Sequence, residues 1–222
     1  MATSDILVIV WLSVRVAVLA TLVVLPIALG IAWLLARRSF IGRGLVEALV
    51  YLPLVLPPVV TGYALLMVLG ARSPLGLSLA FTTTAAVIAA ATMALPLMVR
   101  SMRVAIEQVD RRLEQAAASC GAPPWRVWWT VTLPLSLPGI SAGLILGFAR
   151  ALGEFGATIV VAGNIPEVSR TLPRAIYTAL QRPGGDAAAW QLVMVAVVLS
   201  VAAIVVSEWL IRRQGKRVGL SS

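Results

Sequence analysis

Long apolar stretches, separated by short polar and basic clusters, dominate the pattern of the 222-residue chain. A helix needs roughly 20 apolar residues to cross the hydrocarbon core of a bilayer. Five stretches reach that length, at about 6–36, 48–69, 77–99, 139–162 and 190–211. Arg15 interrupts the first, so we expect its first turns at the membrane interface and residues 16–36 across the membrane. The pattern predicts an all-α integral membrane protein with about five transmembrane helices, in one domain covering residues 1–222.

Composition supports this fold class. Sixty per cent of the residues are apolar and 12% are charged, whereas soluble domains are about half apolar and about a quarter charged. The mean hydropathy is +0.96. The net charge of +9 does not indicate nucleic-acid binding, because the basic residues are scattered in short clusters with no aromatic-lined surface. With one cysteine and no histidine, we expect neither an intrachain disulfide nor a bound metal.

The basic residues also predict the orientation of the chain, because loops rich in Lys and Arg are retained on the cytoplasmic side. Connections at 37–47, 100–137 and 212–222 together hold twelve Lys and Arg residues. The other connections hold four, namely Arg72, Arg170, Arg174 and Arg182. We therefore expect the N-terminus outside and the C-terminus in the cytoplasm.

The longest cytoplasmic connection, at about 100–137, carries a short alanine-rich helix followed by prolines and tryptophans. Gly121 and Pro123 predict where this helix stops. Val109, just before it, is expected to be exposed. A face of small residues can be approached closely by another protein, although short alanine-rich helices also serve as ordinary connectors.

The spacing in this segment resembles the EAA loop of ABC importer permeases. That loop has an acidic residue and two alanines, then three residues and a glycine, then nine residues followed by an aliphatic residue, any residue and Leu-Pro. The positions that match are Ala116, Ala117, Gly121, Val131, Leu133 and Pro134. Gln115 stands where the acid is usual, and Glu114 supplies an acid one residue earlier. The resemblance implies the ABC importer permease fold, with a coupling helix that docks on a separate cytoplasmic ATPase.

Charged residues occur inside the fourth apolar stretch, although a charge at the bilayer centre costs roughly 2.5–3.5 kcal/mol. Arg150 and Glu154 are four residues apart, which places them on one face of a helix. One interpretation is an electropositive path for an anion, in which Glu154 holds Arg150 and Thr158 adds a hydroxyl group. The other is an ion pair that only stabilises the helix.

Two stretches carry residues that predict unusual helix packing. Prolines and a glycine in the second stretch favour a bent or locally unwound span, at Pro53, Pro57, Pro58 and Gly62. Small residues recur every four positions in the fourth, at Gly139, Gly143, Gly147 and Ala151. Such a stripe lets a second helix approach closely, from the same chain or from a twin subunit.

Further segments narrow the resemblance to the molybdate branch of the sulfate and molybdate permeases. They lie at 148–158, 164–166 and 170–173, with support at 52–60, 95–100 and 181–185. The resemblance implies import of molybdate through a bacterial inner membrane. On the outer connection, Asn164, Arg170 and Arg174 are the candidate contacts with an extracytoplasmic binding protein.

The energy source follows from the sequence and the resemblance together. The chain has no GxxxxGK[ST] phosphate loop, so we expect no catalytic residues and no cofactor in this chain. The resemblance implies a second copy of the chain, two cytoplasmic ATPase subunits that bind ATP and Mg²⁺, and an oxyanion-binding protein on the outer face.

Other functions stay open at this point. The nearest is the same machine carrying tungstate, sulfate or thiosulfate, because these dianions differ little in charge and shape. A secondary transporter or channel would need its own coupling-ion site, and the chain shows no internal repeat. A membrane-embedded enzyme would need acids that converge with a nucleophile, whereas five of the acids sit near span ends, namely Glu47, Glu107, Asp110, Glu114 and Glu208.

Overall fold

The computed structural model describes residues 3–71, 73 and 78–217, with side chains to residue 206 in the last helix. Arg72 and the side chains of Glu208 and of the basic residues at 212–217 lie outside this part. Every regular element in the described part is helical: α1 (Thr3–Arg37), α2 (Arg43–Val55), α3 (Pro58–Leu69), α4 (Thr83–Glu107), α5 (Arg111–Ser119), α6 (Pro124–Val127), the π-helix η1 (Trp128–Thr132), α7 (Leu133–Leu152), α8 (Gly156–Val161), α9 (Leu172–Leu180) and α10 (Asp186–Arg217). The expected all-α fold is confirmed.

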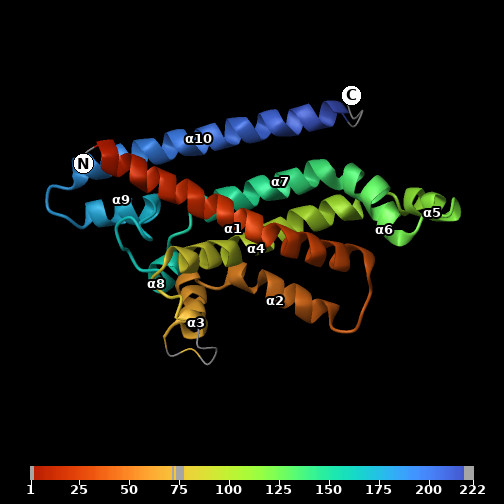
Figure 1. The fold of residues 1–222 in the computed structure, drawn as a ribbon, viewed down its shortest axis with the longest axis horizontal. Helices are drawn as coiled ribbons and strands as arrows, with labels where there is room; N and C mark the ends of the chain where they lie inside the picture. Colours follow the sequence, from red (N-terminus) through yellow and green to blue (C-terminus); the bar gives the residue numbers. More distant parts are fainter. Residues whose placement is uncertain (1–2, 72, 74–77, 218–222) are drawn as a thin grey trace.

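Helices α1, α4 and α7 form the centre of the bundle (Figure 1). The contact between α1 and α4 is built largely from alanines with no exposed surface, including Ala20 and Ala28 on α1 and Ala86 and Ala90 on α4. Small side chains bring the two backbones close together, which is how helices associate where lipid removes the hydrophobic driving force.

The stripe of small residues on α7 packs against α4 of the same chain, not against a twin subunit. A Cβ atom added at Gly139 would meet the Cβ of Ala105. A Cβ atom added at Gly147 would meet the sulfur of Met98. Both contacts would be shorter than any that real Cβ atoms make, so neither glycine leaves room for a side chain. The spacing of four residues therefore marks the α4–α7 contact.

The second apolar stretch is broken into α2 and α3, and the chain direction bends by 112° between the two helices. Leu56 and Pro57 adopt extended backbone angles between them, and Pro58 begins α3, where its missing N–H group costs nothing. The bend predicted from the prolines is present, and it is far sharper than a kink.

Helix boundaries differ from the expected spans in several places: α4 begins at Thr83 and not at 77, and α10 covers Asp186–Arg217 and not 190–211. Helix α4 extends to Glu107, eight residues beyond the expected end at residue 99, into the segment assigned to the coupling loop. The fourth stretch does not run unbroken over 139–162: a continuous helical run covers Pro124–Leu152, and α8 follows after a break. Apolar composition alone carried no sign of that break.

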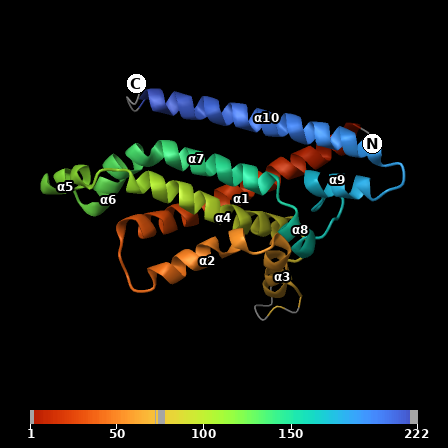
Figure 2. The ribbon, with the colours of Figure 1, turned by 180° about the vertical axis from the view of Figure 1, so that it is seen from behind.

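In the described part, four helices are long and apolar enough to cross a membrane, and the bent pair α2–α3 makes a candidate fifth. The two ends of the bundle carry different segments (Figure 2). Helices α5 and α6, the end of α1 and the end of α10 share one end, while α9 and the first turns of α1 and α10 share the other. The connections expected on one side of the membrane therefore lie at one end of the molecule.

Candidate functional site

Helix α5 is set off from α4 by two local signals. The Asp110 side chain accepts a hydrogen bond from the Arg112 backbone N–H at 2.9 Å and caps the start of the helix. At the other end Gly121 has a φ of +82°. The Ala122 N–H donates to the carbonyl of Ala117, and the Gly121 N–H to that of Ala118. This double closure is a Schellman motif, which favours glycine at the left-handed position.

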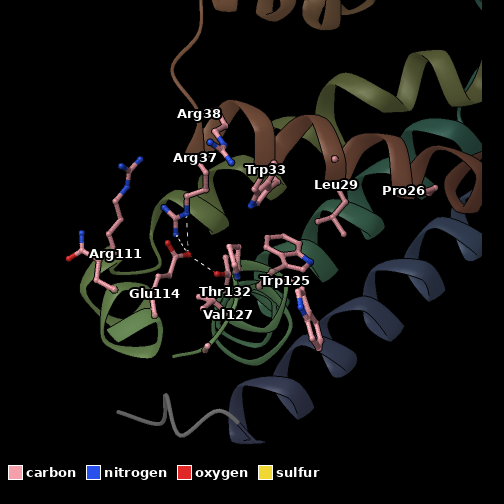
Figure 3. A pocket seen from close by; sticks show the side chains of 16 residues that line it. Pro26, Leu29, Trp33, Arg37, Arg38, Arg111, Glu114, Trp125, Val127 and Thr132 are labelled. Atoms are coloured by element: carbon pink, nitrogen blue, oxygen red, sulfur yellow. Dashed lines mark hydrogen bonds and ion pairs between the residues drawn. The ribbon is translucent and has the colours of Figure 1, made fainter. Parts of the chain in front are cut away.

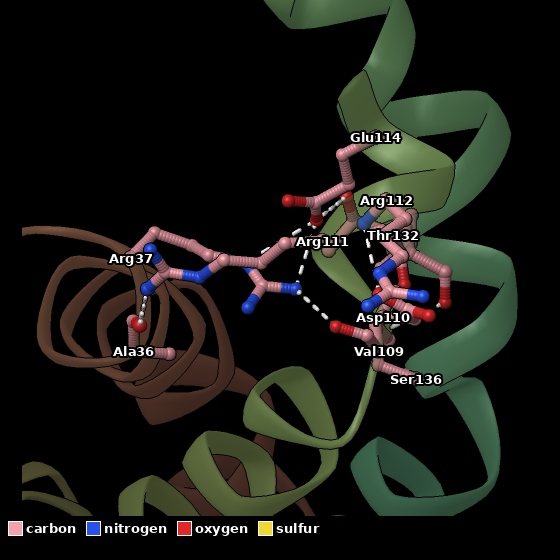
Figure 4. Close-up of polar contacts among 10 residues, drawn as sticks. Ala36, Arg37, Val109, Asp110, Arg111, Arg112, Glu114, Thr132 and Ser136 are labelled. Carbon is pink, nitrogen blue, oxygen red and sulfur yellow. Dashed lines mark hydrogen bonds and ion pairs between the residues drawn. The ribbon is translucent and has the colours of Figure 1, made fainter. Parts of the chain in front are cut away.

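Glu114 attaches α5 to the bundle (Figure 4). Its Oε1 accepts hydrogen bonds from Nε and Nη2 of Arg37, at 3.2 and 2.9 Å, and from the hydroxyl of Thr132 at 2.6 Å. Arg37 also donates to the carbonyl of Val109 at 3.1 Å. The carboxylate thus joins the coupling segment to the end of α1 and to the turn that leads into α7.

The two acid positions of the motif therefore have different surroundings. Glu114 is partly buried and faces its own chain, whereas Gln115 is exposed. Ala116 is also exposed and Ala117 is half-buried. Val109, expected to be exposed, is buried, because the short α4–α5 connection turns it against the bundle. Among the four consecutive positions from Glu114 to Ala117, Gln115 and Ala116 are the accessible ones.

The second half of the motif coincides with the π-helix. In η1 the Leu133 N–H donates to the carbonyl of Trp128, five residues back. Val131 and Leu133 are half-buried and Pro134 is exposed at the first turn of α7. A π-turn absorbs the hydrogen bond that a proline inside a helical run cannot make. The Leu-Pro of the motif thus marks where the coupling segment passes into α7.

Arg150 and Glu154 form an ion pair across the end of α7, at 2.5 Å between Nη1 and Oε2. They do not share one continuous helix as expected, because α7 ends at Leu152. Glu154 lies in the break, and its Oε1 accepts a hydrogen bond from the Ala157 N–H at 2.7 Å. Its side chain is 1% exposed. Glu154 therefore holds α7 and α8 together, in addition to pairing with Arg150.

Thr158 is buried and its hydroxyl donates to the carbonyls of Glu154 and Phe155, at 3.2 and 3.0 Å. In this conformation the hydroxyl is occupied by its own helix. Next to it, α8 packs directly on α3: a Cβ atom at Gly62 would lie 2.5 Å from the carbonyl oxygen of Ala157. The two interrupted segments of the fold, 56–57 and 153–155, therefore flank one contact between short helices.

The comparisons with known proteins decide the family. The family described as "Binding-protein-dependent transport system inner membrane component" matches residues 25–218. The chain belongs to that family. It is 49% identical over 216 residues to the molybdenum transport system permease protein ModB of Escherichia coli K12, covering 94% of each chain. It is 43% identical over 198 residues to a putative molybdenum transport system permease protein of Bacillus subtilis, covering 85% of this chain and 86% of the other.

Among solved structures, the inward-facing MetNI methionine ABC transporter has a chain with the same fold. The TM-score is 0.76 at 19% identity, over 96% of this permease and 99% of that chain. The expected ABC importer permease fold is thereby confirmed.

Of the three residues expected on the outer surface, two are half-exposed and one is buried. Asn164 and Arg170 are half-exposed and bound to each other, with Arg170 Nε donating to Asn164 Oδ1 at 3.0 Å. Arg174 is completely buried, so its side chain is not on the expected surface. Its Nη1 donates to the Gly163 carbonyl at 2.5 Å, while Nε and Nη2 have no hydrogen-bond partner among the described residues. The strongly amphipathic α9 directs this residue inward.

Burial lowers the pKa of Arg174 to about 10, and the negative charge of Glu154 opposes that shift. The guanidinium is therefore still charged at neutral pH. Arg150 is ion-paired with Glu154, and the charge of the same carboxylate also influences Arg174. The sequence suggested only one of these arginines as part of the path.

The residues that sequence reasoning missed are the partners of the motif. Arg37 appeared only as a basic loop residue, and Thr132 only as a spacer within the motif. Among the acids named from the sequence, Glu47 pairs with Arg43 and Arg103, and Glu107 pairs with Arg103. No group of His, Cys, Asp and Glu suited to a metal ion occurs in the described part.

Proposed function

We propose that this permease is the membrane subunit of an ATP-driven importer that moves molybdate from the outer face to the cytoplasm. The observation that carries the proposal is the 49% identity to the E. coli molybdenum permease across 94% of both chains. In this proposal the chain spans the inner membrane, with its N-terminus on the outer side and its C-terminus on the cytoplasmic side, as the basic connections indicate.

Two copies of the chain would pair, stand on two ATPase subunits that bind ATP and Mg²⁺, and receive molybdate from an extracytoplasmic binding protein. This chain performs no covalent chemistry in the proposal. Exposed apolar side chains on α3, such as Val59, Tyr63 and Met67, offer a surface for the second copy.

The contacts of the described residues suggest how coupling would work. An ATPase that moves α5 would pull on Glu114, and thereby on Arg37 of α1 and on Thr132 before α7. At the far end of α7, Arg150 and Glu154 connect that helix to α8, which packs on α3. Movement at the coupling helix would thus reach the interrupted helices, where irregular backbone is tolerated because it lies against protein or lines a cavity.

The test is uptake of labelled molybdate by proteoliposomes that hold the permease, its ATPase and loaded binding protein. We expect uptake to require ATP and both partners, and to persist with sulfate in large excess. Equal competition by sulfate would reject the molybdate assignment and keep the transport class. Tungstate is expected to compete, because its size and charge nearly equal those of molybdate. ATP hydrolysis by the purified permease alone would contradict the whole proposal.

A further inference from the structure

A cavity of about 900 Å³ lies between the second half of α1 and the coupling segment (Figure 3). Glu114, Gln115 and Thr132 of the coupling segment form part of its lining, and the proposed transport path does not include it. One wall is α1, from Pro26 to Arg37, and the other comes from α5, α6 and η1. A rise of about 1.5 Å per residue makes the α1 wall roughly 17 Å long.

The cavity is apolar along most of its length and basic at one end. Pro26, Leu29 and Gly30 line the end that points into the bundle. Further along, the rings of Trp33 and Trp128 pack edge to face, with 6.3 Å between their centroids. The opposite end carries arginines (Figure 3). Tryptophan is the residue most typical of the headgroup level of a bilayer.

Two of the arginines at the basic end have no acidic partner in the part of the chain that the structure describes. The Arg38 guanidinium lies over the ring of Trp33, 5.7 Å from its centre. Arg111 reaches only the Ala36 carbonyl, at 3.4 Å. Arg37 is already neutralised by Glu114. The mouth of the cavity therefore has an uncompensated positive charge beside an aromatic wall.

We propose that this cavity binds one anionic phospholipid of the cytoplasmic leaflet. Its phosphate would lie between Arg38 and Arg111, and its acyl chains along Trp33 and Leu29. The length of the wall equals about half of the hydrocarbon thickness, which is the depth of one leaflet. Basic pockets between helices on the cytoplasmic side are suited to anionic headgroups. A bound lipid would also contact α5, so the coupling helix would sense the composition of the leaflet.

The experiment is native mass spectrometry of the full-length permease released from membranes of equimolar phosphatidylglycerol and phosphatidylcholine. The wild-type chain should retain one phosphatidylglycerol per copy in preference to phosphatidylcholine. Arg38→Gln and Arg111→Gln should each lower retained phosphatidylglycerol about fivefold, as expected for loss of one basic group near an anionic surface. The matched control is Arg112→Gln, because Arg112 is the exposed neighbour on α5 and does not line the cavity.

A second variant tests the apolar end. A Cβ atom added at Gly30 would have open space around it, so Gly30→Phe directs a ring into the cavity. Gly44→Phe adds the same ring where there is also space but no cavity. We expect only Gly30→Phe to abolish retention.

Equal retention of both lipids, equal loss in Arg112→Gln, or unchanged retention in Gly30→Phe would each overturn the proposal. Displacement of the lipid by the ATPase subunit would also overturn it, because the occupant would then be a protein. Lipid retention is measured without transport, so this result is independent of the proposed substrate.

Discussion

Glu114 of the coupling helix is bound to Arg37 at the end of α1, 77 residues away in the sequence. Their side chains are 20% and 10% exposed, so the pair is partly removed from water. The coupling helix is thus held to the bundle by a charged contact, and not only by its two covalent connections. A charged hydrogen bond of this kind contributes about 1.5–3 kcal/mol.

The first prediction concerns this contact. Glu114→Ala should lower the thermal stability of the purified permease, because among the described residues Arg37 then keeps only the Val109 carbonyl as an acceptor. We expect a loss of about 1.5–3 kcal/mol and reduced co-purification of the ATPase. Thermal unfolding in detergent and a pull-down of the ATPase measure the two effects.

The matched control is Glu107→Ala, which removes an ion pair with Arg103 at 2.8 Å on the same end of the bundle. Glu107 is 40% exposed, and a solvent-exposed pair contributes about 0–1 kcal/mol. Equal losses of stability in Glu114→Ala and Glu107→Ala would show that the Arg37 contact has no special role.

The second prediction concerns the junction of α7 and α8. Glu154→Ala removes both the partner of Arg150 and the acceptor of the Ala157 N–H, so it should destabilise the chain more than Arg150→Ala. Glu154→Gln keeps an oxygen for that N–H group. The double variant Arg150→Gln with Glu154→Gln should therefore be more stable than Glu154→Gln alone, since the Arg150 charge is no longer stranded, while Arg174 loses its negative neighbour in both variants.

Uptake separates the two interpretations of this pair. If the pair forms part of the anion path, the Gln–Gln double variant folds normally and transports poorly. Normal uptake by that variant would show that the pair is only structural. Thermal unfolding and uptake must be measured on the same preparation.

The third prediction concerns the buried Arg174. Arg174 is a completely buried cation, and two of its nitrogens have no partner in the part of the chain that the structure describes, so its removal should cost little stability. Arg174→Met should leave the free energy of unfolding unchanged or raise it, while uptake falls strongly. The exposed Arg182→Met is the control for loss of one charge at the same end. Full uptake in Arg174→Met would exclude a transport role.

The lowered pKa of Arg174 also predicts how its effect on stability depends on pH. Because its folded-state pKa, about 10, lies below its ordinary value, the unfolded chain binds this proton more tightly. Protonation of Arg174 therefore opposes folding at all pH values below about 10, and the effect fades as the pH rises above it. The difference in stability between wild type and Arg174→Met should stay constant across neutral pH.

The sequence was sufficient for the spans that are long and uniformly apolar, since α1 and α10 follow directly from composition. It was also sufficient for the bend at Pro57, because prolines act locally. The break after Leu152 was missed, because Gly153 and Glu154 look like helix residues until the Ala157 N–H is seen to bind the carboxylate. The burial of Arg174 was missed for a related reason. Hydrophobic patterning treats arginine as polar, whereas only the packing of α9 reveals which way it points.

The last prediction concerns the turn that ends the coupling helix. Gly121 has a φ of +82°, and no atom lies within 4 Å of a Cβ placed on it. Gly121→Leu is therefore strained only through its backbone, by roughly 1–2 kcal/mol. Loss of that turn releases the Ala117 and Ala118 carbonyls and should reorient the end of α5.

We expect Gly121→Leu to insert in the membrane normally and to lose the ATPase on co-purification, while capture of the binding protein at the opposite end is unchanged. Gly121→Asn should retain most ATPase, because asparagine tolerates the left-handed conformation. Gly44→Leu adds the same side chain in open space at a residue without a positive φ, and it should have little effect. If Gly121→Leu keeps stoichiometric ATPase and normal uptake, the segment from α5 to η1 is a plain connector and does not couple ATP hydrolysis to transport.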